Sequence, residues 1–334
     1  MKTSNVTIVG GGIVGICTAL SLQDRGINVR LIEKDDPGQA TSFGNAGVIS
    51  PWSIIPHSMP GFWKKIPKLM LKRWRPLSIY LATWPHMIPW GLKFLSNGTE
   101  KKTRKIADAM SMLCAPSIEL YRKHLNGTGY EYLVKDTGYL QLVRNGKDAT
   151  LEDLAYQIRL QKGAKIEIVK GSDLRSLEPA LSSKFEAGIV THDVARCVLP
   201  GKLSSALAKK AKAQGAEIIK DQIVEINKSD DSWSLKGKIN KYIAQSLVIS
   251  AGAWSRELLA CFGLSVPLMT ERGYHIHCAD SEIEINNSVV FPEGGVIASL
   301  MEGGVRIAGQ AEFGAIDAPF DPKRQSILSK IAIE

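Results

Sequence analysis

The 334-residue sequence contains little cysteine, and no two cysteines have the spacing of a metal-binding or redox pair. Its five cysteines are odd in number and widely separated: Cys17, Cys114, Cys197, Cys261 and Cys278. A disulfide framework or a cysteine zinc site needs paired or closely spaced thiols, so the sequence predicts neither. The expected compartment is a reducing cytoplasm, and no metal site is predicted.

Long unbroken apolar runs are also missing. The uncharged run 76–92 contains Pro85 and Pro89, and it is shorter than the roughly 20 residues that a membrane-spanning helix needs. A second uncharged run, 6–23, contains four glycines and no small-residue cleavage site, which argues against a signal peptide. No transmembrane helix is predicted.

Acidic residues are scarce between positions 52 and 105, where the sequence has eleven Lys or Arg residues and one acidic residue, Glu100. Five of the seven tryptophans lie in the same segment: Trp52, Trp63, Trp74, Trp84 and Trp90. This composition fits a nucleic-acid surface, an anionic membrane surface or an ordinary basic surface. We expect peripheral membrane contact through residues 52–105, on the inner face of the cytoplasmic membrane, and no nucleic-acid partner.

What the sequence does contain is a β-α-β pattern at its start. Residues 6–9 are a β-branched run that predicts a buried strand, 13–25 have helical apolar spacing, and 29–33 predict a second strand. Further along the chain, the pattern predicts helices over 106–124, 151–161 and 201–214, and strands over 139–143, 216–219, 222–227 and 242–250.

The glycines Gly10, Gly12 and Gly15 stand between the first strand and the helix, in the spacing of the dinucleotide fingerprint. The first glycine allows a tight turn, the second lets backbone N–H groups approach a pyrophosphate, and the third lets the helix pack closely on the strand. Glu33 ends the second strand, where a carboxylate accepts hydrogen bonds from ribose hydroxyls. The acid disfavours NADP, while the fingerprint alone leaves FAD and NAD open.

The residues after Glu33 carry a family resemblance. The segment Ala40-Thr41-Ser42-Phe43-Gly44-Asn45-Ala46-Gly47, together with 177–180, 251–255 and 271–275, resembles the amine-oxidising flavoenzymes of the D-amino acid oxidase superfamily. Bacterial D-amino acid dehydrogenase and glycine oxidase are the nearest members. The resemblance implies FAD as the cofactor, with Thr41 and Ser42 at the pyrophosphate and 45–47 along the flavin. The predicted cofactor residues are Gly10, Gly12, Ile13, Val14, Gly15, Glu33, Lys34, Thr41, Ser42, Asn45, Ala46, Gly47, Val48, Val224, Ala251, Gly252 and Trp254.

The fold that follows is α/β, a Rossmann-like FAD-binding sheet with an inserted α+β substrate domain built on an antiparallel sheet. The FAD-binding domain is expected over 1–50 and 170–265, and the substrate domain over 51–169 and 266–322. Residues 323–334 are expected to begin a helix. Family chains continue further, so the resemblance implies that a C-terminal segment is missing and that turnover by this chain alone is weak.

The resemblance also implies a reaction, the oxidation of a D-amino acid by hydride transfer from Cα to flavin N5. The imino acid formed then hydrolyses to a keto acid and ammonia. Two alternatives stay open, an oxidase of glycine, sarcosine or another small secondary amine, and an inactive FAD-binding fragment. Candidate substrate-pocket residues are Ser50, Arg272 and Tyr274, and Arg306 is the other arginine near the expected pocket. The expected partners are a small amino acid and an electron acceptor such as a membrane quinone.

Overall fold

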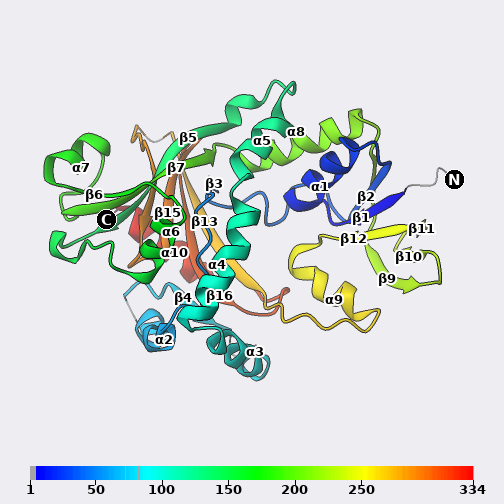
Figure 1. Ribbon diagram of the computed structural model, residues 1–334, viewed down its shortest axis with the longest axis horizontal. Coiled ribbons are helices and arrows are strands. Elements are labelled where there is room, and N and C mark those ends of the chain that lie inside the picture. The colour runs from blue at the N-terminus through cyan, green and yellow to red at the C-terminus, as the bar shows by residue number, and fades with distance from the viewer. Residues whose placement is uncertain (1–4, 72, 81–82, 281, 334) are drawn as a thin grey trace. The chain divides into compact units, whose positions relative to one another are not determined.

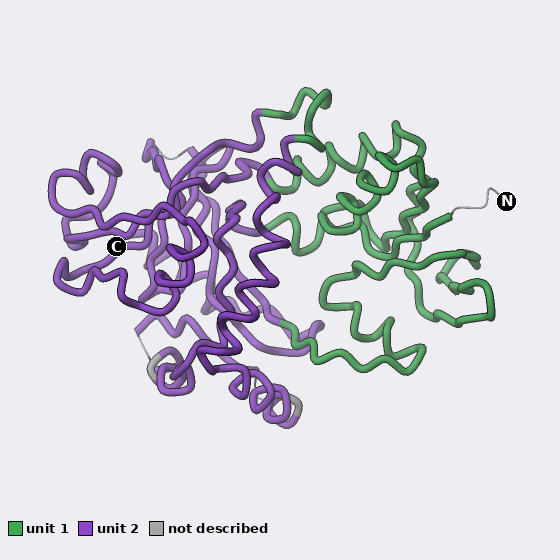
Figure 2. The backbone as a smooth tube through the Cα atoms, viewed as in Figure 1, with its two compact units in different colours: residues 1–44, 123–131, 200–270 green, residues 45–122, 132–199, 271–334 purple. Residues whose placement is uncertain are grey.

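The computed structural model describes residues 5–71, 73–80, 83–280 and 282–333 (Figure 1). The chain divides into two compact units (Figure 2), the first formed by 1–44, 123–131 and 200–270 and the second by 45–122, 132–199 and 271–334. These bounds differ from the predicted domains mainly at 170–199, which belong to the second unit. The reason is that strand β7 (Ala187–Cys197) pairs along its whole length with β5 (Val134–Val143) of that unit.

The first unit contains a four-stranded, wholly parallel sheet in the order β12-β1-β2-β8. Helix α1 connects β1 to β2, which confirms the β-α-β unit predicted at the start of the chain. It contacts α8, and the Gln23 side-chain amide donates to the Ala211 carbonyl at 2.9 Å. The elements are β1 (Val6–Val9), α1 (Ile13–Gln23), β2 (Val29–Glu33), α8 (Pro200–Ala213), β8 (Glu217–Lys220) and β12 (Ser246–Ile249).

A three-stranded antiparallel sheet in the order β11-β10-β9 completes the first unit. Its strands are β9 (Ile223–Lys228), β10 (Trp233–Gly237) and β11 (Lys241–Ala244), and they are followed after β12 by η4 (Gly252–Trp254) and α9 (Ser255–Ala260). The single strand predicted over 242–250 is wrong. The chain changes sheets at 245, because Ala244 pairs with Trp233 of the small sheet while Ser246 pairs with Val6 of the parallel sheet.

The second unit is built around a nine-stranded, mostly antiparallel sheet with the order β13-β16-β15-β14-β5-β7-β3, to which β4 adds beside β16 and β6 beside β7. The predicted antiparallel substrate sheet is therefore confirmed. The strands not yet given are β3 (Val48–Ile49), β4 (Leu77–Ile79), β6 (Ile166–Lys170), β13 (Glu271–Ala279), β14 (Ser288–Phe291), β15 (Val296–Met301) and β16 (Gly304–Phe313). A core of buried side chains that includes Leu140, Phe291 and Ile307 packs on this sheet.

The second unit also contains helices and short turns, and the end of α5 and the first residue of η2 belong to the first unit. These elements are α2 (Phe62–Leu71), α3 (Trp84–Ser96), α4 (Glu100–Cys114), α5 (Ser117–Leu125), η2 (Glu131–Leu133), η3 (Gly146–Asp148), α6 (Leu154–Gln161), α7 (Gly171–Leu177) and α10 (Pro322–Ile333) (Figure 1). The long helix predicted over 106–124 is wrong, because the structure has two helices on either side of Pro116. Proline has no N–H to continue the hydrogen-bond ladder of a helix interior. Among the described residues, no helix is both long and apolar enough to span a membrane.

Candidate functional site

The three predicted glycines form a tight turn between β1 and α1. Gly10 has a φ of +109°, and a Cβ built there would lie 2.5 Å from the Ser250 carbonyl oxygen. A Cβ at Gly15 would lie 2.0 Å from the Gly10 carbonyl oxygen, so this glycine allows the first helical turn to press against the end of β1. A Cβ at Gly12 would meet only the Ser42 hydroxyl, at 3.4 Å. The space beside Gly12 is therefore open, as the fingerprint requires for a phosphate that approaches the backbone.

Helix α1 begins directly behind this turn, with Gly12 as its N-cap and no side-chain cap from that residue. The Ile13 N–H donates to the Ser42 hydroxyl at 2.9 Å, and the Val14 side chain is 65% exposed. The N–H groups of a first helical turn lack intrahelical acceptors and carry a partial positive charge. The open space at Gly12 thus faces a terminus suited to an anion such as a pyrophosphate.

Glu33 ends β2 beside the glycine turn. One carboxylate oxygen accepts from the Gly11 N–H at 2.5 Å, and the other accepts from the N–H groups of Lys34 at 2.8 Å and Asp35 at 3.3 Å. These bonds fix the carboxylate in place. Because a carboxylate offers about four lone-pair positions, the side chain retains capacity to accept from a ribose hydroxyl.

The other predicted residues of the first unit lie around the same turn, except one. Ala251 lies against Gly10, since a Cβ added to Gly10 would be 2.7 Å from the Ala251 Cα. The Lys34 ammonium lies 3.9 Å from the centre of the Trp254 ring, next to Gly252 in η4. Thr41 is exposed one position before Ser42.

Val224 is the exception among these residues. It lies in β9 and is 44% exposed, and no direct contact ties it to the glycine turn in the described part of the chain. The connection between β9 and the turn is indirect, because the Asp221 N–H donates to the Glu33 carbonyl at 2.9 Å just before β9 begins. The assignment of Val224 to the cofactor site stays a prediction.

Four predicted cofactor residues, Asn45 to Val48, belong to the second unit. The Asn45 side chain accepts from the Gly47 N–H at 2.8 Å, and the Cys197 N–H donates to the Gly47 carbonyl at 2.7 Å. Gly47 has a φ of +73°, and a Cβ there would lie 2.3 Å from the Cys197 carbonyl oxygen. Ala46 lies within this turn, and Val48 begins β3. The segment is therefore held in one defined conformation.

Arg306 on β16 holds the same segment from another side. Its guanidinium donates to the Asn45 carbonyl at 3.1 Å, and only 6% of the residue is exposed. Burial lowers the pKa of this guanidinium. Sequence reasoning placed Arg306 near the pocket without giving it a role, because its partner is 261 positions away.

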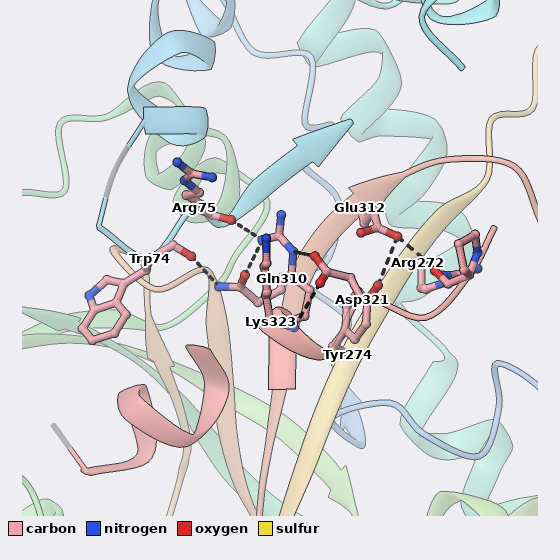
Figure 3. A network of polar contacts seen from close by, with 10 residues as sticks. Trp74, Arg75, Arg272, Tyr274, Gln310, Glu312, Asp321 and Lys323 are labelled. Atoms are coloured by element: carbon pink, nitrogen blue, oxygen red, sulfur yellow. Dashed lines mark hydrogen bonds and ion pairs between the residues drawn. The ribbon is translucent and has the colours of Figure 1, made fainter. Parts of the chain in front are cut away.

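Arg272 and Tyr274 lie together on β13, but in a network of protein contacts (Figure 3). The Arg272 guanidinium donates to the carbonyls of Pro319 at 2.8 Å and of Ala318, and it lies 3.5 Å from the Glu312 carboxylate. The Tyr274 hydroxyl donates to the same carboxylate at 3.1 Å, and its ring is buried in the core of the sheet. These contacts give both side chains a structural role.

Ser50, the third pocket candidate, lies just after β3, and its hydroxyl accepts from the Trp52 N–H at 3.1 Å. In the sheet order, β3 and β13 are at opposite ends, and no described contact joins Ser50 to Arg272 or Tyr274. The structure therefore does not bring the three candidates together. Sequence reasoning also missed Ser250, whose hydroxyl donates to the Gly10 carbonyl at 2.9 Å. Its position directly before Ala251 and Gly252 was the signal that could have indicated it.

Comparison with known proteins identifies the family of this chain. The profile of the FAD dependent oxidoreductase family, DAO, matches residues 5–334. The D-amino-acid oxidase of Bradyrhizobium diazoefficiens is 31% identical over 328 residues, which are 97% of this chain and 78% of that protein. The crystal structure of glycine oxidase from Geobacillus kaustophilus has a TM-score of 0.71 at 18% identity and matches 99% of this chain and 78% of its own.

A structure with cofactor bound is also similar. The L-α-glycerophosphate oxidase from Mycoplasma pneumoniae with FAD bound has a TM-score of 0.71 at 19% identity, over 99% of this chain and 78% of that one. The open space at Gly12, the helix terminus behind it and the fixed carboxylate of Glu33 fit the phosphate and ribose of such a dinucleotide. The chain therefore belongs to the DAO family of FAD-dependent oxidoreductases, and its cofactor is FAD.

Proposed function

We propose that this oxidoreductase oxidises the CH–NH bond of a D-amino acid to an imino acid, which hydrolyses to a keto acid and ammonia. The observation that carries the proposal is the 31% identity to a D-amino-acid oxidase over 97% of this chain. FAD, when bound, supplies the acceptor for the hydride that leaves the substrate Cα. The protein's own contribution is to bind and orient both molecules and to exclude water.

The first unit supplies the residues proposed to bind the adenosine and pyrophosphate end of FAD. Gly12 leaves the backbone accessible, Ser42 fixes the start of α1 through the Ile13 N–H, and Glu33 offers an anchored carboxylate to the ribose. These groups are fixed by protein hydrogen bonds before any ligand binds. Such preorganisation lowers the entropy that binding costs.

The second unit supplies a sheet on which Arg272 and Tyr274 of β13 are already engaged in protein contacts. Burial raises the pKa of Tyr274, and its hydroxyl donates to Glu312, so at neutral pH it is a neutral hydrogen-bond donor within the protein. No general base on the chain is required when the substrate amine binds neutral, since the hydride leaves from Cα and the nitrogen lone pair forms the imine. The proposed reaction therefore does not use Arg272 or Tyr274 as acid or base.

Anaerobic mixing of the FAD-loaded protein with single substrates tests the proposal. Each reaction needs one substrate molecule per flavin, so loss of flavin absorbance detects even slow chemistry. We expect D-alanine or D-proline to bleach the flavin faster than their L-enantiomers do. Bleaching by glycine or sarcosine alone would indicate the small-amine oxidase, and bleaching by glycerol 3-phosphate would indicate CH–OH oxidation. A flavin that no substrate bleaches would support an FAD-binding fragment without activity.

The electron acceptor is tested in the same experiment. We propose a membrane quinone as the acceptor, in keeping with the expected membrane contact. A soluble quinone analogue added to the bleached protein should then restore the flavin absorbance faster than air does. Faster recovery in air would identify an oxidase and contradict this part of the proposal.

A further inference from the structure

Helix α3 is apolar on both its faces. Its inner face packs on the sheet, since the Trp90 ring centre lies 5.4 Å from that of Phe313 on β16. Within the helix, the Phe94 ring stacks on Trp90 with their centres 5.1 Å apart. Its outer face carries apolar residues every four positions, Trp84, Ile88 and Leu92, which are 43%, 57% and 66% exposed. A helix that is apolar all round is normally covered on every side. The outer face of α3 therefore has the composition of a surface that is covered in the working protein.

Helix α2 extends this apolar surface. It contacts α3 through Phe62, whose ring centre lies 5.7 Å from that of Phe94. Trp63 and Leu71 on α2 are 59% and 81% exposed. Figure 1 shows the two helices next to each other, outside the strands of the second unit. We name the exposed residues Trp63, Leu71, Trp84, Ile88 and Leu92 the α2–α3 surface.

The charged residues on and between α2 and α3 have one sign. The exposed residues Lys64, Lys65, Arg73, Arg75 and Lys93 lie on or between the two helices. The sequence from 52 onward has its first acid at Glu100, and that carboxylate pairs with Arg104 on α4. Lys72 and the side chain of Lys68 lie outside what the structure describes.

Within residues 52–105, where membrane contact is expected, only part of the segment has exposed tryptophans. Three of the five tryptophans have structural roles: Trp74 is 5% exposed, Trp90 packs on the sheet, and the Trp52 indole donates to the His192 carbonyl at 3.1 Å. Only Trp63 and Trp84 of the five are exposed. The exposed tryptophans that could contact a membrane therefore lie on α2 and α3 and not along the whole segment.

We propose that the α2–α3 surface binds the surface of an anionic lipid bilayer. Apolar side chains that include tryptophan, with lysine and arginine beside them and no acid within residues 52–99, match an interface with a hydrocarbon layer under negative headgroups. A nucleic acid would match the charge but would leave Leu71, Ile88 and Leu92 without an apolar environment. The contact lies along the membrane plane, since neither helix is long enough to cross the bilayer.

Vesicle sedimentation tests the proposal without any substrate, so its result is independent of the proposed reaction. The probes are vesicles of phosphatidylcholine alone and of phosphatidylcholine with one third phosphatidylglycerol. We expect binding to the anionic vesicles at low salt and release at high salt, because the screening length falls from about 10 Å at 0.1 M to about 3 Å at 1 M salt. Equal binding to both vesicles, or binding to neither, would overturn the proposal.

Paired variants separate the charge from the apolar contact. Lys64→Gln with Lys65→Gln should weaken binding about fivefold per lysine. Ile88→Ser with Leu92→Ser should weaken it about tenfold per side chain. These residues are exposed, so the thermal midpoint of the FAD-loaded protein should not change.

Matched controls lie elsewhere on the chain. Lys209→Gln with Lys238→Gln makes the same change in net charge at exposed positions of the first unit. Met112→Ser with Leu113→Ser removes apolar residues that are 81% and 73% exposed at the end of α4. Both controls should bind vesicles as the parent protein does. Controls that lose binding as strongly as the α2–α3 variants would overturn the proposal, and so would a vesicle-free dimer that only the α2–α3 variants dissociate.

Discussion

Replacing Gly12 with alanine should weaken FAD binding by roughly tenfold or more while leaving the fold intact. Gly12 has a φ of −70° and a ψ of 177°, which alanine adopts without strain. The new Cβ would meet only the Ser42 hydroxyl, at the ordinary contact distance of 3.4 Å. A change of this kind stabilises a protein by about 0.4–1 kcal/mol, since it restricts the unfolded chain. The apoprotein should therefore unfold at the same temperature as the parent or slightly above it.

Gly12→Ala is expected to lower the affinity for FAD. Its methyl group occupies the open space through which a pyrophosphate reaches the backbone N–H groups. Each hydrogen bond to a charged acceptor contributes about 1.5–3 kcal/mol. Losing one such bond weakens FAD binding roughly tenfold to a hundredfold, and losing two weakens it by the product of such factors.

Gly15→Ala is the matched comparison, because it adds the same methyl group three residues later. Its Cβ would lie 2.0 Å from the Gly10 carbonyl oxygen and 2.7 Å from the Ser250 hydroxyl, well inside van der Waals contact. Overpacking of this kind lowers the free energy of unfolding by about 1–3 kcal/mol. A clash with a backbone atom falls at the upper end of this range. This variant should lower the thermal midpoint of the apoprotein by several degrees in addition to losing FAD.

Two measurements on each apoprotein distinguish these outcomes, the thermal midpoint and the quenching of FAD fluorescence on titration. We expect Gly12→Ala to change only the FAD titration, and Gly15→Ala to change both the FAD titration and the thermal midpoint. A Gly12→Ala protein that binds FAD as tightly as the parent would show that the pyrophosphate does not lie at this turn. A Gly12→Ala apoprotein as unstable as Gly15→Ala would show that the space beside Gly12 is not open.

Three further predictions concern single side chains. Glu33→Gln should weaken FAD binding by about 1.5–3 kcal/mol in the same titration, because a neutral amide replaces a charged acceptor, and unchanged affinity would remove the ribose assignment. Burial alone would raise the pKa of Asp221, but hydrogen bonds from Tyr242, Asn240 and Ile239 outweigh it and lower the pKa. The stability that Asp221 contributes is therefore present above its unfolded pKa of about 4 and is lost as the pH falls through the lower folded pKa. In thermal unfolding, Asp221→Asn should destabilise the protein at pH 7 and much less at pH 3. Burial raises the pKa of Cys17 to about 12 and of Cys197 to about 11. A thiol reagent at pH 8 should therefore modify exposed Cys261 in the native protein and leave these two unmodified, whereas rapid labelling of either would contradict its raised pKa.

The N-terminal part of the site could be predicted because its signals are local. The strand, turn, helix and second strand lie within residues 6–33, and each glycine has a steric reason that its spacing already indicates. The acid at the end of β2 follows from the same pattern. The contact of the Ser250 hydroxyl with the Gly10 carbonyl joins this turn to a distant part of the chain.

Strand β7 could not be predicted, although it pairs with β5, β3 and β6 in the second sheet. Its sequence interrupts the apolar pattern with His192, Asp193 and Arg196. Asp193 has a φ of +56°, and the register with β5 shifts between Thr137 and Tyr139, which marks an irregularity in the pairing. A bulge changes which residues face the core, so strict alternation fails there.

The roles of Arg272 and Arg306 show why the rest of the site depends on the fold. Both are arginines on neighbouring strands of one sheet, and the sequence analysis placed both near the expected pocket. Arg272 instead binds carbonyls at 318 and 319 together with Glu312, while Arg306 binds the carbonyl of Asn45. None of these partners lies within a turn or helix of its arginine, so no periodicity could have indicated them.

Arg306 also explains how the Asn45–Gly47 turn keeps its shape. A buried guanidinium is stable only where hydrogen bonds replace its lost hydration, and the Asn45 carbonyl provides one of them. The same turn is fixed by the Cys197 backbone on β7 and by the positive φ of Gly47. The glycine turn at Gly10 is thus determined largely by its own sequence, whereas the Asn45–Gly47 turn is determined by β7 and β16. A family motif can be recognised at both places, but the conformation of the second depends on strands that lie far from it in the sequence.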